Sequence, residues 1–358
     1  MKPIIPFMIA GLLPLTLVGQ EADQPVENWT LVNLAVTDDQ VIPAYSQFAE
    51  AAADLARKGE AFCSDLSQDT LAEFQASFHT SMDAWQQVQH IQFGPVTYFN
   101  WNFRLHYWPD ENGTGARQLD AIIAEANEEV LDSERFARES VGVQGFPALE
   151  RLLFQEDSQQ QLSSNPFRCS VAQTIAVNIS DMAAGIHMRW VDEFRETVAN
   201  ADERGFFESA EDATIDFMKA QVEPIRRIQQ QKIEEVLGES AGRERVRRAE
   251  SWRSNRSLRN IRLNVKALEN LFNGSESTEY QLNNVLYAED VDTINANFSE
   301  LDATLASLPD SMSEVMESDS GREQLLDLAA KLDALYESLE AALKNTDLYL
   351  GFNSLDGD

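Results

Sequence analysis

Apolar residues recur every three or four positions along most of this chain, and this spacing constrains the fold more than any other feature. Similar patterns run through both halves of the sequence, over residues 42–62, 71–85, 119–130, 148–154, 171–198, 210–237, 243–271, 291–305 and 324–343. Such spacing places the apolar residues on one face of a helix. Alternating patterns typical of strands are nearly absent. We therefore predict an all-α protein.

The length of the chain suggests two domains. At 358 residues it is longer than the chains that usually fold around a single hydrophobic core. The sequence predicts two up-and-down helical bundles packed together, over 41–200 and 208–358. Residues 21–40 are acidic and carry no clear pattern, which indicates a flexible lead-in. Residues 93–115 form a long connection rich in aromatic side chains. These side chains either pack this loop against the first bundle or form a binding site for an aromatic ligand.

The N-terminus has the pattern of a secretory signal peptide. Lys2 precedes an apolar run over 4–18, and small or polar residues follow it. We expect residues 1–20 to be a signal peptide and the protein to be periplasmic. No later stretch reaches about 18 uninterrupted apolar residues, so no membrane span is expected in the mature chain. No cysteine lies near the cleavage region, so a lipid anchor there is not expected either.

The sequence contains two cysteines, Cys63 and Cys169, which the expected periplasmic location would expose to oxidising conditions. Paired thiols tend to oxidise outside the cytoplasm, which favours a disulfide between them. Two separate buried thiols are the alternative. A metal site is not indicated, because two cysteines alone do not supply the clustered ligands that it needs.

The charge of the chain excludes one large class of partner. With 28 Lys and Arg against 60 Asp and Glu, the formal net charge is −32. Binding to nucleic acid needs a cationic surface, so nucleic acid is not an expected partner. Anionic membrane surfaces are disfavoured for the same reason. Metal ions and basic partners remain compatible with this surface.

One segment departs from that acidic background. Residues 243–266, interpreted as part of a helix, carry nine Lys or Arg residues and only two Glu. Because apolar positions occupy two sides of this helix, we expect Arg253 and Arg256 to be held at an interface by carboxylates. Two explanations stay open for the cluster: a network of salt bridges between the domains, or capture of an anion or other ligand.

A polar stripe on the predicted second helix is a candidate metal site. His79, Asp83, Gln86 and His90 are spaced by four, three and four residues, which aligns them on one helical face. Two imidazoles and a carboxylate are suitable ligands for a transition metal. A solvated face beside the apolar one is the alternative. The G-x-S-x-G pattern over 238–242 follows a predicted helix and lacks the strand that a serine hydrolase requires.

Several local patterns, taken in order, resemble the imelysin family, and together they cover nearly the whole mature chain. They are Ala84-Trp85, Gln92-Phe93-Gly94-Pro95, Tyr107-Trp108-Pro109-Asp110, Gly145-Phe146-Pro147-Ala148-Leu149-Glu150, Ser251-Trp252-Arg253-Ser254 with Arg256-Ser257-Leu258, and the terminal Gly351-Phe352-Asn353-Ser354-Leu355-Asp356-Gly357-Asp358.

This resemblance implies two helical bundles, a location in the cell envelope and a role in iron or haem acquisition, and the family is also classed with metallopeptidases. The family signature is G-x-H-x-x-E. Here Gly145 and Glu150 match, but Pro147 occupies the histidine position. A metal at Glu150 would therefore lack one ligand, and we expect this carboxylate to be paired with Arg253 or Arg256.

We therefore expect a noncatalytic envelope protein that binds iron, haem or an envelope partner in a cleft near Glu150, Trp85 and residues 93–108. The alternative is a metallopeptidase of the imelysin type that recruits ligands from elsewhere, such as His79 and His90. The sequence does not identify the ligand further.

Overall fold

The computed structural model describes residues 25–26, 28–201, 205–274, 279–346 and 348–351. Every regular element in this part of the chain is a helix, as predicted, and strands are absent from it. None of the described helices is long and apolar enough to cross a membrane. The expected signal peptide, residues 1–20, and most of the C-terminal pattern lie outside the described residues.

The first body of the molecule is built around three long helices, α2 (Ile42–Ser64), α3 (Gln68–Gln86) and α9 (Pro166–Arg189). Helix α2 packs against both of the others. Between α3 and α9 the chain forms shorter elements: η2 (Gly94–Asn100), α4 (Trp101–Leu105), α5 (Thr114–Glu125), η3 (Glu128–Leu131), α6 (Ser133–Phe136), η4 (Val141–Val143), α7 (Phe146–Leu153) and α8 (Ser158–Ser164). Two further elements, η5 (Trp190–Phe194) and α10 (Arg195–Ala199), continue α9.

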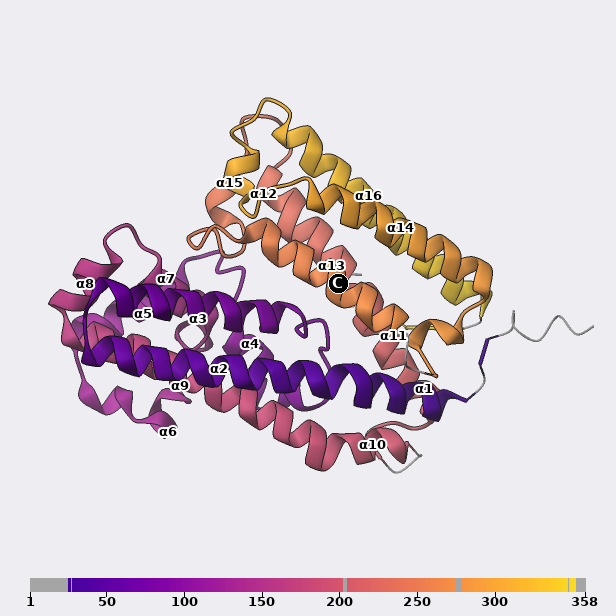
Figure 1. Cartoon of the computed structure of the whole chain (residues 1–358), viewed down its shortest axis with the longest axis horizontal. Coiled ribbons are helices and arrows are strands. Elements are labelled where there is room, and N and C mark those ends of the chain that lie inside the picture. The colour runs from indigo at the N-terminus through magenta and orange to yellow at the C-terminus, as the bar shows by residue number, and fades with distance from the viewer. Residues whose placement is uncertain (1–24, 27, 202–204, 275–278, 347, 352–358) are drawn as a thin grey trace, which may run out of the picture.

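The second body lies along one side of the first (Figure 1). Its elements are α11 (Ala210–Arg227), η6 (Ile228–Glu234), α12 (Glu235–Leu237), η7 (Val246–Arg248), α13 (Ser257–Asn273), η8 (Leu282–Val285), α14 (Ala288–Ala306), α15 (Met312–Val315) and α16 (Gly321–Asn345). In Figure 1, α11 and α13 lie between the first body and the pair α14 and α16. Helix α13 contacts α3 on one side and α14 on the other.

The lead-in expected to be flexible over 21–40 is helical from Trp29 onwards. Helix α1 (Trp29–Val36) and the π-helical turn η1 (Thr37–Val41) run directly into α2. Val32 and Val36 of α1 are fully buried, and α1 contacts α10 and α11. The side chain of Asn33 donates to the carbonyl of Ala210 at 2.7 Å. These contacts with the rest of the chain stabilise a helix in a segment whose acidic residues, which flank α1, had suggested a flexible lead-in.

The helix predicted over 243–271 begins only at Ser257. Its first half is irregular apart from the single turn η7. Ser251 and Asn255 have φ angles of 51° and 54°, in the left-handed region that side-chain-bearing residues rarely adopt. Contacts with the first body favour this shape over a helix, because Glu250 and Ser254 bind side chains there.

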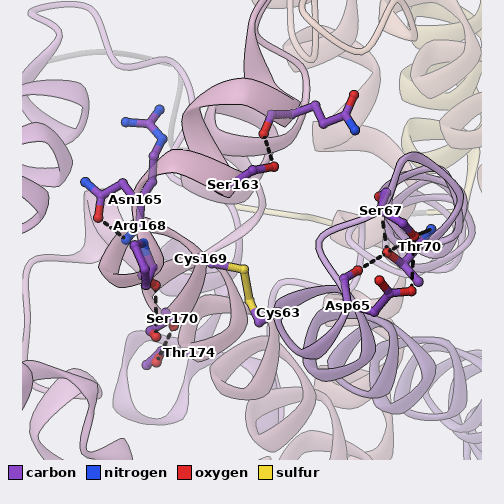
Figure 2. Close-up of a disulfide and its surroundings, with 12 residues drawn as sticks. Cys63, Asp65, Ser67, Thr70, Ser163, Asn165, Arg168, Cys169, Ser170 and Thr174 are labelled. Atoms are coloured by element: carbon purple, nitrogen blue, oxygen red, sulfur yellow. Dashed lines mark hydrogen bonds between the residues drawn. A yellow bond between two sulfur atoms is a disulfide. The ribbon is translucent and has the colours of Figure 1, made fainter.

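The predicted disulfide is present. Cys63 in the last turn of α2 is bonded to Cys169 in the first turn of α9, with 5.8 Å between the two Cα atoms (Figure 2). It joins segments 106 residues apart in the sequence. The bond therefore closes the end of the first body where α2 and α9 pack together.

Candidate functional site

The motif 145–150 forms the start of helix α7. Gly145 is the N-cap, and Pro147 stands in the first turn, where its missing N–H leaves no helical bond unmade. A Cβ on Gly145 would lie 2.2 Å from the carbonyl oxygens of both Arg104 and Leu105. Because only glycine permits that approach, α7 begins directly against the backbone of α4. Glu150 follows one turn later, where α7 meets the second body.

Glu150 is held by a serine of the second body. Its side chain is 4% exposed, and its Oε1 accepts hydrogen bonds from Ser254, from the backbone N–H at 3.0 Å and from the Oγ hydroxyl at 2.7 Å. Burial raises the pKa of Glu150, and the Ser254 bonds and the charge of Arg253 oppose that rise. The predicted ion pair with Arg253 or Arg256 is wrong, because Arg256 binds Asp83 instead and Arg253 forms no ion pair with Glu150.

A cavity of about 220 Å³ lies beside Glu150, between the first body and residues 247–253. The loop 106–113, helix α7 and the end of η6 with α12 form its other walls. Two indole rings, of Trp108 and Trp252, give the cavity an aromatic lining. The charged side chains that line it are Asp110, Glu111, Glu150, Arg151, Glu235, Arg247, Arg248, Glu250 and Arg253.

Two opposite charges are buried where this cavity meets the core. Lys232 and Glu250 are 4% and 2% exposed, and the Lys232 Nζ lies 2.8 Å from Glu250 Oε2. Glu250 also accepts hydrogen bonds from Asn260 Nδ2 at 2.8 Å and from His106 Nε2 at 2.9 Å, and Lys232 donates to Asn264 at 2.7 Å.

The pKa values of both groups of this buried pair are shifted by burial and by their partners. Burial alone would raise the pKa of Glu250, but the charge of Lys232 and the hydrogen bond from His106 outweigh it, and the pKa is lowered. Burial lowers the pKa of Lys232, and Glu250 opposes that shift. A buried pair with all its hydrogen bonds made is a neutral, well-ordered unit. It joins the end of α4, η6 and α13 at the boundary between the two bodies.

The polar stripe on α3 forms salt bridges with the second body. Arg256 donates to the Asp83 carboxylate and, at 2.9 Å, to Nδ1 of His79. Arg259 Nε also donates to Asp83, at 2.9 Å. Burial and the charge of Arg256 lower the pKa of His79 to about 4, and burial lowers that of His90 to about 3. The predicted ligand set of His79, Asp83 and His90 is therefore corrected. Arginines bind both oxygens of Asp83 and Nδ1 of His79, and His90 lies beyond the end of α3 at Gln86.

No group of three His, Cys, Asp or Glu side chains that could hold a metal ion occurs among the described residues. Glu150 has no imidazole beside it at the motif position, which Pro147 occupies. The donor set on which a zinc hydrolase depends, usually three protein ligands and one open position, is not assembled in this part of the chain.

Four residues expected near the cleft pack elsewhere. Trp85 lies in the core against Phe48, with 5.4 Å between their ring centroids. Pro95 is buried, and Gly94 has a φ of 65° and lies against Phe194. Phe93 packs among other aromatic rings, those of Trp190, Phe194, Phe207 and Phe217. Trp85, Phe93, Gly94 and Pro95 therefore hold the loop in place, and Trp108 is the expected aromatic residue that does line the cavity.

Three residues that line or support the cavity were not predicted from the sequence: His106, Lys232 and Trp252. One signal for Lys232 is present in the sequence, because it falls four residues after Ile228 and four before Val236, on an otherwise apolar stripe that is buried. Trp252 belongs to the pattern Ser251-Trp252-Arg253-Ser254. Its role was obscured by the helix wrongly predicted there.

Comparisons with known proteins agree on the fold. A family model described as imelysin matches residues 41–339. A comparison with curated proteins gave no match. Among solved structures, an imelysin-like protein from Psychrobacter arcticum 273-4 is similar with a TM-score of 0.72 and 19% identity, over 92% of this chain and 99% of that one.

A second solved structure is named as a putative iron-regulated protein A precursor, from Parabacteroides distasonis ATCC 8503. It is similar with a TM-score of 0.71 and 15% identity, over 89% of this chain and 97% of that one. At such identities the likeness concerns the fold alone. The cavity beside Glu150 therefore has to be interpreted from its own residues.

Proposed function

The chain belongs to the imelysin family, and we propose that it is an exported, noncatalytic binding protein associated with iron or haem uptake. The ligand would occupy the cavity between the two bodies, beside Glu150 and Trp108. This proposal joins the family, which the match over 41–339 establishes, to the chemistry of that cavity.

The state of Glu150 is the observation that carries the proposal. A catalytic metal needs an ionised carboxylate and further ligands beside it. Here one oxygen of Glu150 already accepts two hydrogen bonds from Ser254, burial raises its pKa, and Pro147 supplies no imidazole. These features favour binding of a complete ligand over activation of a metal-bound water.

The link to iron comes from a relative of the same fold. The Parabacteroides distasonis structure is named as an iron-regulated protein A precursor. An aromatic cavity with arginines at its wall also suits iron ligands, because haem and many iron chelates combine flat rings with carboxylates. Export is supported by the apolar N-terminal run and by the Cys63–Cys169 disulfide, since disulfides persist mainly outside the cytoplasm.

Binding of iron species to the purified mature protein tests this proposal. Calorimetric titrations with haem and with ferric citrate would be made on the wild type, on Trp108→Ala and on Trp101→Ala. Trp101 is a matched control because its indole packs near Phe99, outside the cavity. We expect at least one species to bind the wild type and the Trp101 variant, and Trp108→Ala to weaken that binding about tenfold.

A second measurement addresses the peptidase alternative. We expect no metal-dependent cleavage of an unfolded protein substrate, and a metal content that does not change in Glu150→Ala. Chelator-sensitive cleavage that disappears in Glu150→Gln would establish a metallopeptidase instead. A wild-type protein that binds neither haem nor ferric citrate would refute the binding role.

A further inference from the structure

The cationic segment 243–266 divides into two parts with different partners. Four of its nine Lys and Arg residues form ion pairs: Arg256 with Asp83, Arg259 with Asp83 and Asp310, Arg262 with Asp310, and Lys266 with Glu269. The other five have no ion pair with any described residue: Arg243, Arg245, Arg247, Arg248 and Arg253. The network expected between the domains thus accounts for Arg256 and Arg259 only, because Arg262 and Lys266 pair within the second body.

Unpaired arginines stand out in a chain with 60 acidic residues and 28 basic ones. Three of the five, Arg247, Arg248 and Arg253, line the cavity beside Glu150, and Arg151 from α7 lines it as well. Arg247 and Arg248 are exposed, so they lie where the cavity opens to solvent, whereas Arg253 is partly buried. A partly buried guanidinium without a carboxylate partner keeps donors available for a ligand.

Trp252 orders two of these guanidinium groups. The Arg253 Cζ lies 4.5 Å from the centroid of the Trp252 ring, and the Arg247 Cζ lies 5.7 Å from it. Cation–π contact of this kind holds the plane of a guanidinium group and leaves its N–H donors free at the edge. The side chains are therefore positioned before any ligand arrives, which reduces the entropy lost on binding.

Three of the five carboxylates that line the cavity, those of Asp110, Glu150 and Glu250, already have partners within the protein. Asp110 accepts hydrogen bonds from the backbone N–H groups of Thr114 and Ala116. Glu250 is neutralised by Lys232, and burial raises the pKa of Glu150. Of the four arginines, Arg151 pairs with Asp120 at 3.6 Å. Glu111 and Glu235 therefore remain as acidic side chains against Arg247, Arg248 and Arg253.

We infer that Arg247, Arg248 and Arg253 bind the carboxylate groups of a small polycarboxylate, free or as its ferric chelate. The inference rests on the proposed function and names the ligand class of the same cavity. Arginine suits this ligand because its paired N–H donors match the two oxygens of a carboxylate. Trp108 and Trp252 then contact the apolar part of the ligand. The net charge of −32 repels anions elsewhere on the surface and confines their binding to this segment.

The chain offers a closely matched pair of variants to test this. R247Q/R248Q removes two exposed arginines that line the cavity, and R243Q/R245Q removes two exposed arginines of the same segment that do not. Both change the net charge by the same amount. Calorimetric titration with citrate and with ferric citrate, at low and at moderate salt, would be made on the full mature protein and on each variant, after circular dichroism has verified folding.

We expect the wild type to bind citrate or its ferric chelate, R247Q/R248Q to weaken that binding about tenfold or more, and R243Q/R245Q to change it less than about twofold. The single variant R253Q should also weaken it. Added salt should reduce the affinity of the wild type more than that of R247Q/R248Q, because exposed charges are screened.

Equal weakening by the two double variants would overturn the inference, because general charge would then account for the binding. Failure of both citrate species to bind would overturn it as well. If haem still binds the wild type and binds Trp108→Ala more weakly, the proposed function remains supported and only the binding of carboxylates by the arginines is refuted. If iron-free citrate binds as tightly as its ferric chelate and no iron species is preferred, the carboxylate site stands and the role in iron uptake fails.

Discussion

At the scale of single residues, the environment of Glu150 decides how the motif behaves. Its carboxylate is buried, its hydrogen bonds come from Ser254, and Arg253, whose charge opposes the rise of the pKa, forms no ion pair with it. Burial therefore dominates, and the pKa of Glu150 is raised. Burial of this kind makes ionisation of a carboxyl group less favourable than it is in water.

This raised pKa gives Glu150→Gln a distinct dependence on pH. A carboxyl group whose pKa is higher in the folded state stabilises the fold below its unfolded pKa, and that contribution is lost as the pH rises through the folded pKa. The neutral amide that replaces the carboxyl group in the variant has no such loss. Above about pH 4.5, the free energy of unfolding of the wild type should therefore fall relative to that of Glu150→Gln as the pH rises. The difference should change by at most about 1.4 kcal/mol per pH unit. Urea unfolding of both proteins at several pH values measures this, and a constant difference would contradict it.

At the scale of elements, the ion pairs of Arg256 connect α3 to the start of α13. Arg256 is 1% exposed, and besides Asp83 and His79 it donates from Nε to Asn260 at 2.8 Å. Burial lowers the pKa of the guanidinium, and the carboxylate of Asp83 opposes that effect. The stripe on α3 thus serves as an anchor for the second body.

Removing one partner of this pair should be costly. Asp83→Ala leaves the buried guanidinium of Arg256 without its carboxylate, and we expect a loss of about 3 kcal/mol in the free energy of unfolding. Arg256→Ala should lose a similar amount, and the double variant much less than the sum. A double-mutant cycle with Glu150→Ala and Arg256→Ala serves as the control. In this cycle the two losses in the free energy of unfolding should add within about 0.5 kcal/mol. Additive losses in the Asp83 cycle would show that the pair does not stabilise the interface.

At the scale of the whole molecule, a network of buried polar side chains joins the two bodies. Lys232 and Glu250 form its centre, and Asn264 extends it by donating to the backbone carbonyl of Gln86 at 2.8 Å. These groups come from α3, η6, α13 and the segment that precedes α13. Disruption at one point should therefore weaken both bodies together.

Lys232→Met tests that coupling. It leaves Glu250 charged and buried, and we expect a loss of about 3 kcal/mol, with reduced protection from hydrogen exchange in α3 as well as in α13. Lys331→Met is the matched control, because Lys331 pairs with Asp327 at 2.7 Å on the surface, where a pair contributes less than about 1 kcal/mol. Reduced protection confined to α13 would argue against a shared network.

The sequence by itself determined the class of fold and the pairing of its cysteines. Helical spacing depends on neighbours within one or two turns, so the long helices α2, α3, α9, α11, α14 and α16 were predictable from local pattern. With two cysteines and an expected oxidising compartment, only one disulfide, Cys63–Cys169, was possible.

The partners of the charged residues were decided only by the tertiary structure. Asp83 and Arg256 lie 173 residues apart, and Glu150 and Ser254 lie 104 apart, so no local pattern links them. The same contacts keep residues 249–256 out of a helix, although their spacing suggested one. Arginines near Asp83 and Asp310 became paired, whereas Arg247, Arg248 and Arg253 were left facing the cavity. Packing between distant elements determines which charges meet, because an ion pair requires its atoms to be within a few ångströms of each other.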